Sequence, residues 1–290
     1  MEFSDVLQLV LIGISQGCAY ALVAIGFVFI YRATEIVNFA HGELMMLGAF
    51  MALTFAQIIG LNFWLAAALA ILSLGAIGYA LDAVVMRRMA GESHASIFIL
   101  TIAIGLMIRA LAGMIWGWAP LALDAPFLRD YEVGGVIVGM DRAAVIVGAA
   151  ILCFALWRFF TRTAVGLAIQ GASQNQLAAY YSRIPVKRLI SVVWAIAAMV
   201  AAFAGLLMAP VTQVDTGMSA FGIKAFAGAI VGGFGSIPGA LLGCLLIGVA
   251  EPFLDFIFPP LKGVYAYVIM LAVLFVKPDG LIPQTFAKKV

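Results

Sequence analysis

Apolar residues run through this chain in stretches long enough to cross a lipid bilayer, and this feature limits the possible folds more than any other. A spanning helix needs about 20 predominantly apolar residues. Of the 290 residues, 65% are hydrophobic and only 10% are charged, and the mean hydropathy is +1.15. A water-soluble fold cannot hide so much apolar surface, because much of any fold's surface faces its solvent. The candidate runs are Val6–Ile30, Asn38–Ile59, Phe63–Met86, Ser96–Trp118, Ala143–Phe159, Leu189–Ala209, Ile223–Phe258 and Val264–Val276.

The fold class that follows is all-α: a polytopic bundle of transmembrane helices that forms one domain over residues 1–290. The seventh run is too long for one helix, and the string Gly232–Gly239 interrupts it with glycines and a proline. Such a cluster breaks a helix. We therefore expect a short inward arm, a turn and a longer outward arm, so that the bundle contains broken or re-entrant helices.

Lysine and arginine residues indicate the orientation, because they concentrate in cytoplasmic loops. With the N-terminus outside and alternating spans, 11 bases lie inside and 4 outside, while Arg109 lies within a span. The alternation requires the seventh run to enter and return, in agreement with its break. The inside set is Arg32, Arg87, Arg88, Arg158, Arg162, Arg183, Lys187, Arg188, Lys277, Lys288 and Lys289, and the outside set is Arg129, Arg142, Lys224 and Lys262.

Two hydrophilic segments are long enough to be more than turns. Residues 119–142 are expected outside, and the valines and isoleucines at 133–138 favour a short β-hairpin there. Residues 160–188 are expected inside as a helix–turn–helix, because Ala164–Tyr181 contains no proline and Pro185 marks a break before the next span.

Motifs of enzyme chemistry are absent from the sequence. It has no Gly-x-x-x-x-Gly-Lys-[Ser/Thr] phosphate loop, no His-Glu-x-x-His zinc site and no Gly-x-Ser-x-Gly nucleophile elbow. Neither His41 and His94 nor the three cysteines have metal-ligand spacing, so we expect no cofactor and no metal. The net charge of +2 gives no reason to expect a nucleic-acid partner. If the chain moves a solute against a gradient, the energy must come from another protein or from a coupled ion.

Ionisable residues inside predicted spans are the groups that an ion-coupled carrier would use. Asp82 is expected to pair at the membrane boundary with Arg87 or Arg88 instead. Arg109 is expected either to reach outward to the interface or to meet a carboxylate in the bundle. The ionisable residues within spans are Glu43, Asp82, Arg109, Glu251 and Asp255.

The segment Val37–Glu43 places an amide, an imidazole, a glycine and a carboxylate at the start of the second apolar run. One interpretation is simple capping of a helix by Asn38. The other is a broken helix whose exposed backbone and polar side chains line a solute pathway, with the break at Gly232–Gly239 as its counterpart. Paired broken hydrophobic segments indicate a transport site.

At these two segments the sequence resembles a known family. Val37–Glu43, followed by Leu44–Phe50, resembles the Asn-Phe-Ala-His-Gly-Glu signature of LivH-type permeases of branched-chain amino-acid ABC transporters. The resemblance extends over nearly the whole chain. The other segments that carry it are Tyr20–Gly26, Tyr31–Arg32, Gly222–Ala227, Gly232–Ala240, Ile247–Glu251 and Lys277–Ile282.

This resemblance implies the membrane-spanning subunit of an importer in a bacterial inner membrane, which moves branched-chain or related amino acids into the cytoplasm. The implied partners are a second, LivM-like permease, two cytoplasmic ATPases and a periplasmic solute-binding protein. The chain itself would be a transport subunit and not an enzyme. Alternatives are the same machine moving urea or another small amide, an ion-coupled secondary carrier, and a purely structural membrane scaffold.

In such permeases a cytoplasmic loop docks into the ATPase, and the matching stretch here is Asn175–Arg188. It departs from the family pattern at Leu177, where an acid is common, and at Arg183, where glycine is usual. The residues expected to couple to the ATPase are Gly171, Ala172, Ala178, Ala179, Arg183, Ile184, Pro185 and Arg188.

The expected translocation pathway lies at the two breaks and has few charged side chains and apolar walls. Glu43 is expected to brace the break at Val37–Glu43 rather than to bind the substrate amine. The expected pathway residues are Asn38, His41, Gly42, Glu43, Met45, Met46, Phe226, Gly232, Gly233, Gly235, Ser236 and Gly239.

Overall fold

The computed structural model describes residues 3–89, 91–126, 130–133 and 136–282, and they form a helical bundle. Six of its helices are long and apolar enough to cross a membrane. The helices are α1 (Phe3–Thr34), α2 (His41–Leu53), α3 (Phe63–Ala80), α4 (His94–Trp116), α5 (Met140–Arg162), α6 (Ala164–Gln174), α7 (Gln176–Tyr181), α8 (Val186–Thr212), α9 (Ala220–Gly232), α10 (Ile237–Ile257) and α11 (Tyr265–Val276).

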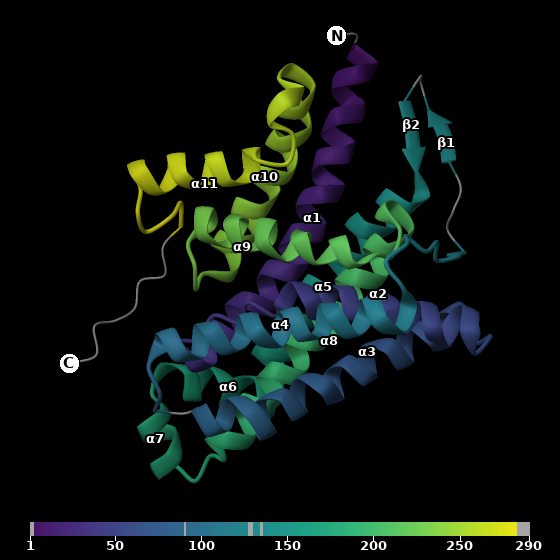
Figure 1. The fold of residues 1–290 in the computed structure, drawn as a ribbon. Helices are drawn as coiled ribbons and strands as arrows, with labels where there is room; N and C mark the ends of the chain where they lie inside the picture. The colour runs from purple at the N-terminus through teal and green to yellow at the C-terminus, as the bar shows by residue number, and fades with distance from the viewer. Residues whose placement is uncertain (1–2, 90, 127–129, 134–135, 283–290) are drawn as a thin grey trace.

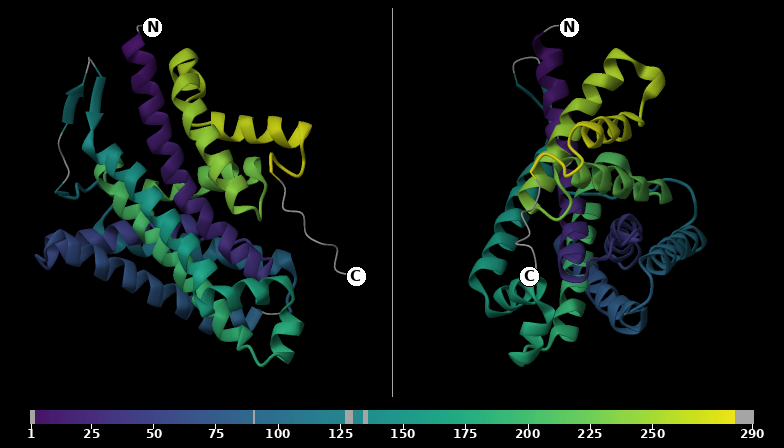
Figure 2. Two further views of the ribbon diagram at one scale, coloured as in Figure 1. Left: turned by 180° about the vertical axis from the view of Figure 1, so that it is seen from behind. Right: turned by 90° about the vertical axis from the view of Figure 1, so that its left-hand side faces the viewer.

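The helix α2 is the centre of the bundle. It packs against α3, α4, α8 and α9, and all of its residues except Leu47 and Met51 are buried. The long helix α1 runs past it and packs against α8 and α10 (Figures 1 and 2). A helix that is apolar on all sides is expected in the core of a bundle, and α2 has that position here.

The second apolar run does not form the single span that its length suggested. Only 13 residues are α-helical, and a π-helical turn η1 (Thr54–Ile58) follows. At 1.5 Å per residue α2 is about 20 Å long, which is shorter than the roughly 30 Å hydrocarbon core of a bilayer. The helix starts late because residues 35–40 leave the helical conformation and Glu35 has a φ of 58°.

The predicted hairpin in the seventh run is confirmed. The arms α9 and α10 pack against each other, and only residues 233–236 between them are non-helical. Four glycines bring the two backbones together: Gly228 and Gly232 on α9 meet Gly239 and Gly243 on α10. Close backbone approach through small residues is a typical way for helices to associate in lipid.

The two hydrophilic segments also fold as expected. Strands β1 (Asp130–Val133) and β2 (Val136–Gly139) form an antiparallel pair in which Asp130 faces Gly139. The stretch Ala164–Tyr181 divides into α6 and α7 at Asn175, where its helical geometry ends. Figures 1 and 2 show β1 and β2 near the N-terminus, whereas α6 and α7 lie at the opposite end of the molecule.

Candidate functional site: two adjacent helix breaks

The first break lies between α1 and α2, and its backbone is satisfied by protein groups. The side chain of Asn38 accepts a hydrogen bond from the N–H of Ala40 at 3.1 Å. The N–H of Phe39 donates to the hydroxyl of Thr101 on α4 at 3.3 Å. Asn38 is not the N-cap residue of α2, which is Ala40 and has no side-chain cap. The side chain of Asn38 therefore orders the backbone of the break just before the helix begins.

The second break, at residues 233–236, is closed by the segment that follows α11. The N–H of Leu281 donates to the carbonyl of Val231, and that of Ile282 to the carbonyl of Gly232, both at 2.9 Å. At the other side, the hydroxyl of Ser236 accepts from the N–H of Gly239 and caps α10. Non-helical backbone at membrane depth persists only where protein or water satisfies it, and this segment supplies the partners.

Sequence reasoning matched Lys277–Ile282 to the family but did not assign Leu281 and Ile282 a role. The available signal was Gly280, which has a φ of 80° and packs against the backbone of Gly233. A side chain at Gly280 would collide there, so the glycine allows the segment to reach the break.

Aromatic rings connect the two breaks. Phe39 in the first break and Phe226 on α9 have ring centroids 5.1 Å apart, and Phe226 lies 5.4 Å from Phe234 in the second break. Phe27 on α1 contacts both Phe226 and His41. Edge-to-face and tilted pairs at these separations are favourable. The expected proximity of the two broken segments is therefore present in the structure.

The helices that bear the breaks also touch directly. A side chain at Gly42 on α2 would begin 2.5 Å from the carbonyl oxygen of Ser219 and 3.0 Å from the Cα of Gly222. Gly42 is thus a packing residue for α9, and a larger residue there would separate the two helices. We therefore expect its substitution to disturb the fold as well as any pathway.

Glu43 and Arg109 form an ion pair between α2 and α4, with Nη2 and Oε1 2.8 Å apart. This confirms the expectation that Arg109 meets a carboxylate in the bundle. The Glu43 side chain is 11% exposed and that of Arg109 is 36% exposed, so the pair lies at the edge of the core. The contact links α2 to α4 beside the first break.

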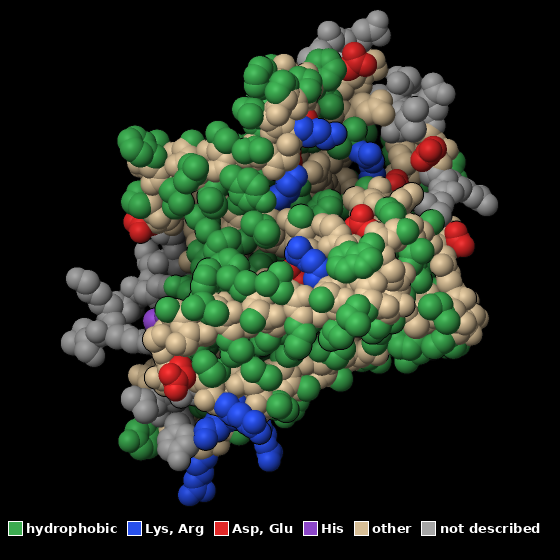
Figure 3. All heavy atoms as spheres, in the orientation of Figure 1, with side chains coloured by type: hydrophobic (Ala, Val, Ile, Leu, Met, Phe, Trp, Pro, Cys, Tyr) green, Lys and Arg blue, Asp and Glu red, His purple; other side chains and the backbone are tan. Residues whose placement is uncertain are grey.

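A second buried carboxylate, Glu251 on α10, is 1% exposed and gathers three donors. It accepts hydrogen bonds from Tyr20 at 2.8 Å and from Gln16 at 3.0 Å, both on α1. It also forms an ion pair with Lys224 of α9. Lys224 belongs to the set of bases expected outside, and its ion pair makes it part of a contact that joins α1, α9 and α10. In Figure 3 basic side chains gather beside α9 and α10, and again at the lower end near α7.

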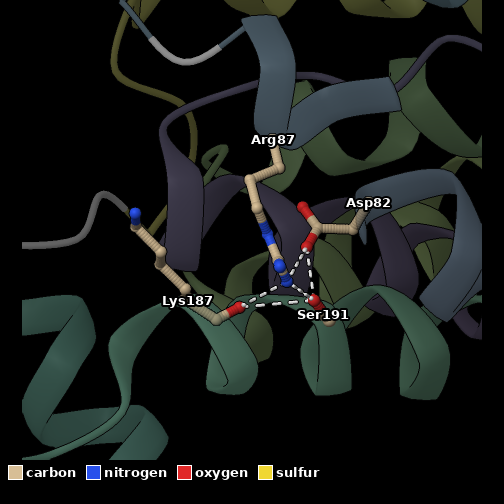
Figure 4. A network of polar contacts seen from close by, with 4 residues as sticks. All are labelled: Asp82, Arg87, Lys187 and Ser191. Atoms are coloured by element: carbon tan, nitrogen blue, oxygen red, sulfur yellow. Dashed lines mark hydrogen bonds and ion pairs between the residues drawn. The ribbon is translucent and has the colours of Figure 1, made fainter. Parts of the chain in front are cut away.

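The boundary pair expected for Asp82 is also confirmed. The hydroxyl of Ser191 on α8 donates to Asp82 at 2.6 Å, and Arg87 lies 3.7 Å from the same carboxylate. Arg87 further donates to Ser191 and to the carbonyl of Lys187 (Figure 4). The network joins the end of the third span to the start of α8.

Several predicted pathway residues have no free surface in this state. Asn38, His41, Met45 and Met46 are at most 1% exposed, and Phe226 is half-buried within the aromatic cluster. Gly42 and Glu43 are buried on α2, and the other five lie at the hairpin: Gly232, Gly233, Gly235, Ser236 and Gly239. The structure thus brings the predicted residues together, but it buries most of them inside one subunit.

The predicted ATPase-coupling residues divide into two groups. Ala172 and Ala179 face inward and pack with Ile169, Leu189 and Val193. Gly171, Ala172, Ala178 and Ala179 therefore do not share one outward face, because alternate sides of α6 and α7 face α8 and solvent. The exposed members are Gly171, Ala178, Arg183, Pro185 and Arg188, and Ile184 is half-buried.

Residues 9–274 match the family described as "Branched-chain amino acid transport system / permease component". The chain is 32% identical to the high-affinity branched-chain amino acid transport system permease protein BraD of Pseudomonas aeruginosa. The match spans 100% of this chain and 99% of BraD. The chain is 28% identical to LivH of Salmonella typhimurium, with the same coverage. It is 26% identical to a probable LivH of Methanocaldococcus jannaschii, over 90% of this chain and 87% of that one.

A solved structure shares the fold. PsaBC from Streptococcus pneumoniae, in complex with Fab, superposes with a TM-score of 0.51 at 15% identity, covering 94% of this chain and 92% of that one. This likeness concerns the architecture alone. Together with six helices able to span a membrane, the full-length match identifies a multi-pass membrane protein and a transport component rather than an enzyme. The chain belongs to the family of permease components of branched-chain amino acid transport systems.

Proposed function

We propose that this chain is the membrane-spanning permease subunit of an ABC importer that carries branched-chain or related amino acids into the cytoplasm. The observation that carries the proposal is the contact between two helix breaks, made through Phe39, Phe226 and Phe234. Transporters build solute sites from discontinuous helices near the bilayer midplane. The names of the relatives favour branched-chain amino acids over urea or another amide.

The proposed pathway passes beside the aromatic cluster at the two breaks. Apolar rings suit the side chain of a branched amino acid, and the charge of Glu43 on α2 is paired with Arg109 on α4. Because Glu43 is already paired, we propose that it holds the first break in place and does not bind the substrate amine. Movement of α2 relative to α9 would expose Asn38 and His41, which are closed off in this state.

The proposed machine contains a second, LivM-like permease, two cytoplasmic ATPases and a periplasmic solute-binding protein. Support for the ATPases comes from α6 and α7, which form a helix pair outside the spanning bundle (Figure 1). A carrier working alone has no need of such a pair. The docking surface is proposed to be the outward side that bears Gly171 and Ala178.

Reconstitution tests the proposal. Proteoliposomes with the assembled permease pair and ATPases, ATP inside, and binding protein outside should accumulate radiolabelled leucine. Unlabelled isoleucine should compete and urea should not. Ala178→Arg should abolish uptake and ATPase stimulation, because a bulky charge cannot be buried in a packed interface without large cost.

The structure adds a control to this test. Ala178 is exposed in the chain, so the arginine variant should insert and elute like the wild type. Ala178→Ser keeps the small volume and should retain uptake. Uptake that continues without ATP, or that Ala178→Arg leaves unchanged, would count against an ATPase-coupled importer.

A further inference from the structure

A cavity of about 670 Å³ lies at the end of the molecule that bears α6 and α7. Its walls come from the end of α1 and the adjoining Ile36, the end of the third span, the loop before α4, and the starts of α4 and α8. The volume falls within the range of about 300–1,000 Å³ that is typical of small-molecule sites. This cavity is separate from the aromatic cluster that joins the two breaks.

The cavity carries charges of both signs on an apolar wall. Two carboxylates, Asp82 and Glu92, and two cations, Arg87 and Lys187, line it. The lining also includes apolar side chains such as Ile97 and Ile190, and most of its exposed surface is hydrophobic.

Two of the charged side chains in this cavity are held in place by protein contacts. Ser191 donates to Asp82 at 2.6 Å, and Arg87 donates to Ser191 at 2.7 Å. In Figure 4 one oxygen of Asp82 points away from this network, and the ammonium group of Lys187 extends away from it as well. A site whose polar groups are already oriented loses less entropy when a ligand binds.

The geometry points to a binding site for a free zwitterionic amino acid with an aliphatic side chain. An anion alone would meet Asp82 and Glu92, and a cation alone would meet Arg87 and Lys187, so each would face like charge. A zwitterion offers an amine to the carboxylates and a carboxylate to the cations, and its side chain can lie on Ile97 and Ile190. The inference rests on the proposed function, which places this end of the molecule in the cytoplasm.

Occupation of the cavity has a mechanical consequence for transport. Val186 and Lys187 line it and lie within the stretch Asn175–Arg188 that is proposed to couple to the ATPase. A ligand that bridges the start of α8 and the start of α4 favours the arrangement it binds and opposes movement of the coupling segment. Accumulated amino acid in the cytoplasm would thereby slow its own import.

Two measurements test the site, and they separate it from the proposed function. The first is binding of radiolabelled leucine to the purified permease–ATPase complex without the binding protein. The second is uptake into proteoliposomes preloaded with unlabelled leucine, compared with leucine-free ones. Leucine-free uptake reports the proposed function alone, whereas binding requires no transport.

The variants are Glu92→Gln, which removes one charge from the cavity, and Ile190→Trp, which fills it. Arg88→Gln is the matched control, because Arg88 is an exposed neighbour of Arg87 that does not line the cavity. We expect saturable binding by the wild type and Arg88→Gln. Glu92→Gln should weaken binding about tenfold, the effect of losing one charge-assisted hydrogen bond, and Ile190→Trp should abolish it.

Internal leucine should slow uptake by the wild type and Arg88→Gln. For Glu92→Gln, the internal leucine concentration that slows uptake should be about tenfold higher. Absence of leucine binding to the wild type, or equal binding by all four proteins, would overturn the site, whatever the uptake. Where Ile190→Trp fails to elute as an intact complex, Glu92→Gln against Arg88→Gln decides.

Discussion

Arg183 holds a backbone conformation that glycine adopts more readily than any other residue. Its φ is 60°, and it follows the end of α7, where a left-handed residue commonly terminates a helix. This is the position at which the resembling permeases usually carry glycine. Arg183 therefore forms the same turn although it replaces glycine. The left-handed conformation costs about 1–2 kcal/mol for a residue with a side chain.

Substitutions at Arg183 should follow this backbone requirement. Arg183→Gly should leave the free energy of unfolding unchanged or raise it by up to about 1 kcal/mol, because strain is relieved but the unfolded chain gains entropy. Arg183→Val should lower it by about 1–2 kcal/mol, since a β-branched residue fits that conformation poorly. Thermal denaturation of the solubilised protein measures both. Arg188→Val, at an exposed helical position, is the control, and an equal loss there would contradict the argument.

The ion pair of Glu43 and Arg109 should behave as a unit. Arg109→Met leaves a nearly buried carboxylate unpaired and should lower the free energy of unfolding by about 2–4 kcal/mol. The double variant Glu43→Gln with Arg109→Met removes both charges, so it should recover most of that loss. Thermal stability in detergent measures the difference. A double variant as unstable as Arg109→Met alone would mean that the pair is not what stabilises this contact.

At the scale of elements, α9 and α10 form a hairpin that depends on the absence of side chains between them. A Cβ at Gly243 would begin 2.8 Å from the Cα of Gly232 and would also collide with the carbonyl oxygen of Gly228. Gly243→Val should force the arms apart, with a loss of about 3 kcal/mol or more. Thermal stability and gel-filtration behaviour of the purified protein report it.

The matched control for the hairpin is Leu242→Val, one residue away on the exposed side of α10. It changes volume by about one methylene and should leave both properties unchanged. If Gly243→Val is as stable as Leu242→Val, the two arms do not need this close approach.

The breaks show what can be predicted from sequence and what cannot. Glycine and proline at 232–239 and the polar cluster at 37–43 locate both breaks, because their effect on the backbone is local. The groups that satisfy them come from elsewhere: Thr101 lies 62 residues from Phe39, and Ile282 closes the break through Gly232. Such partners depend on how helices pack, and single-sequence patterns carry no information on that packing.

Across the whole molecule, composition and run length predict a polytopic helical bundle, because lipid requires helices wherever the backbone is exposed to it. Run length wrongly predicts a complete span for the second apolar run, because α2 is a short core helix. It has protein on all sides, so its hydrophobicity is that of a buried segment and not of a complete span. The order of the helices around α2 likewise follows from its long-range contacts with α3, α4, α8 and α9.

The orientation of the molecule in the membrane is predicted from the segments at the two ends of the bundle. The segment β1–β2 and the pair α6–α7 lie at opposite ends (Figures 1 and 2). The excess of bases in the loops near α6 and α7 places that end in the cytoplasm. A single cysteine at exposed Tyr131 on β1 should therefore react with an impermeant thiol reagent in intact cells. A cysteine at exposed Gln174 on α6 should react only after permeabilisation.

The background for this labelling must lack Cys18, Cys153 and Cys244, of which the last is buried and the other two are half-buried. Replacing them with alanine or serine should leave uptake intact, because none of them forms a disulfide or belongs to a metal-binding group in the described residues. The two probes control for each other, since an inverted protein exchanges their behaviour, whereas broken cells label both. Labelling of the Gln174 position alone in intact cells would reverse the orientation. It would also place the proposed docking surface and the cavity lined by Asp82, Glu92, Arg87 and Lys187 on the outer side, where no ATPase could reach them.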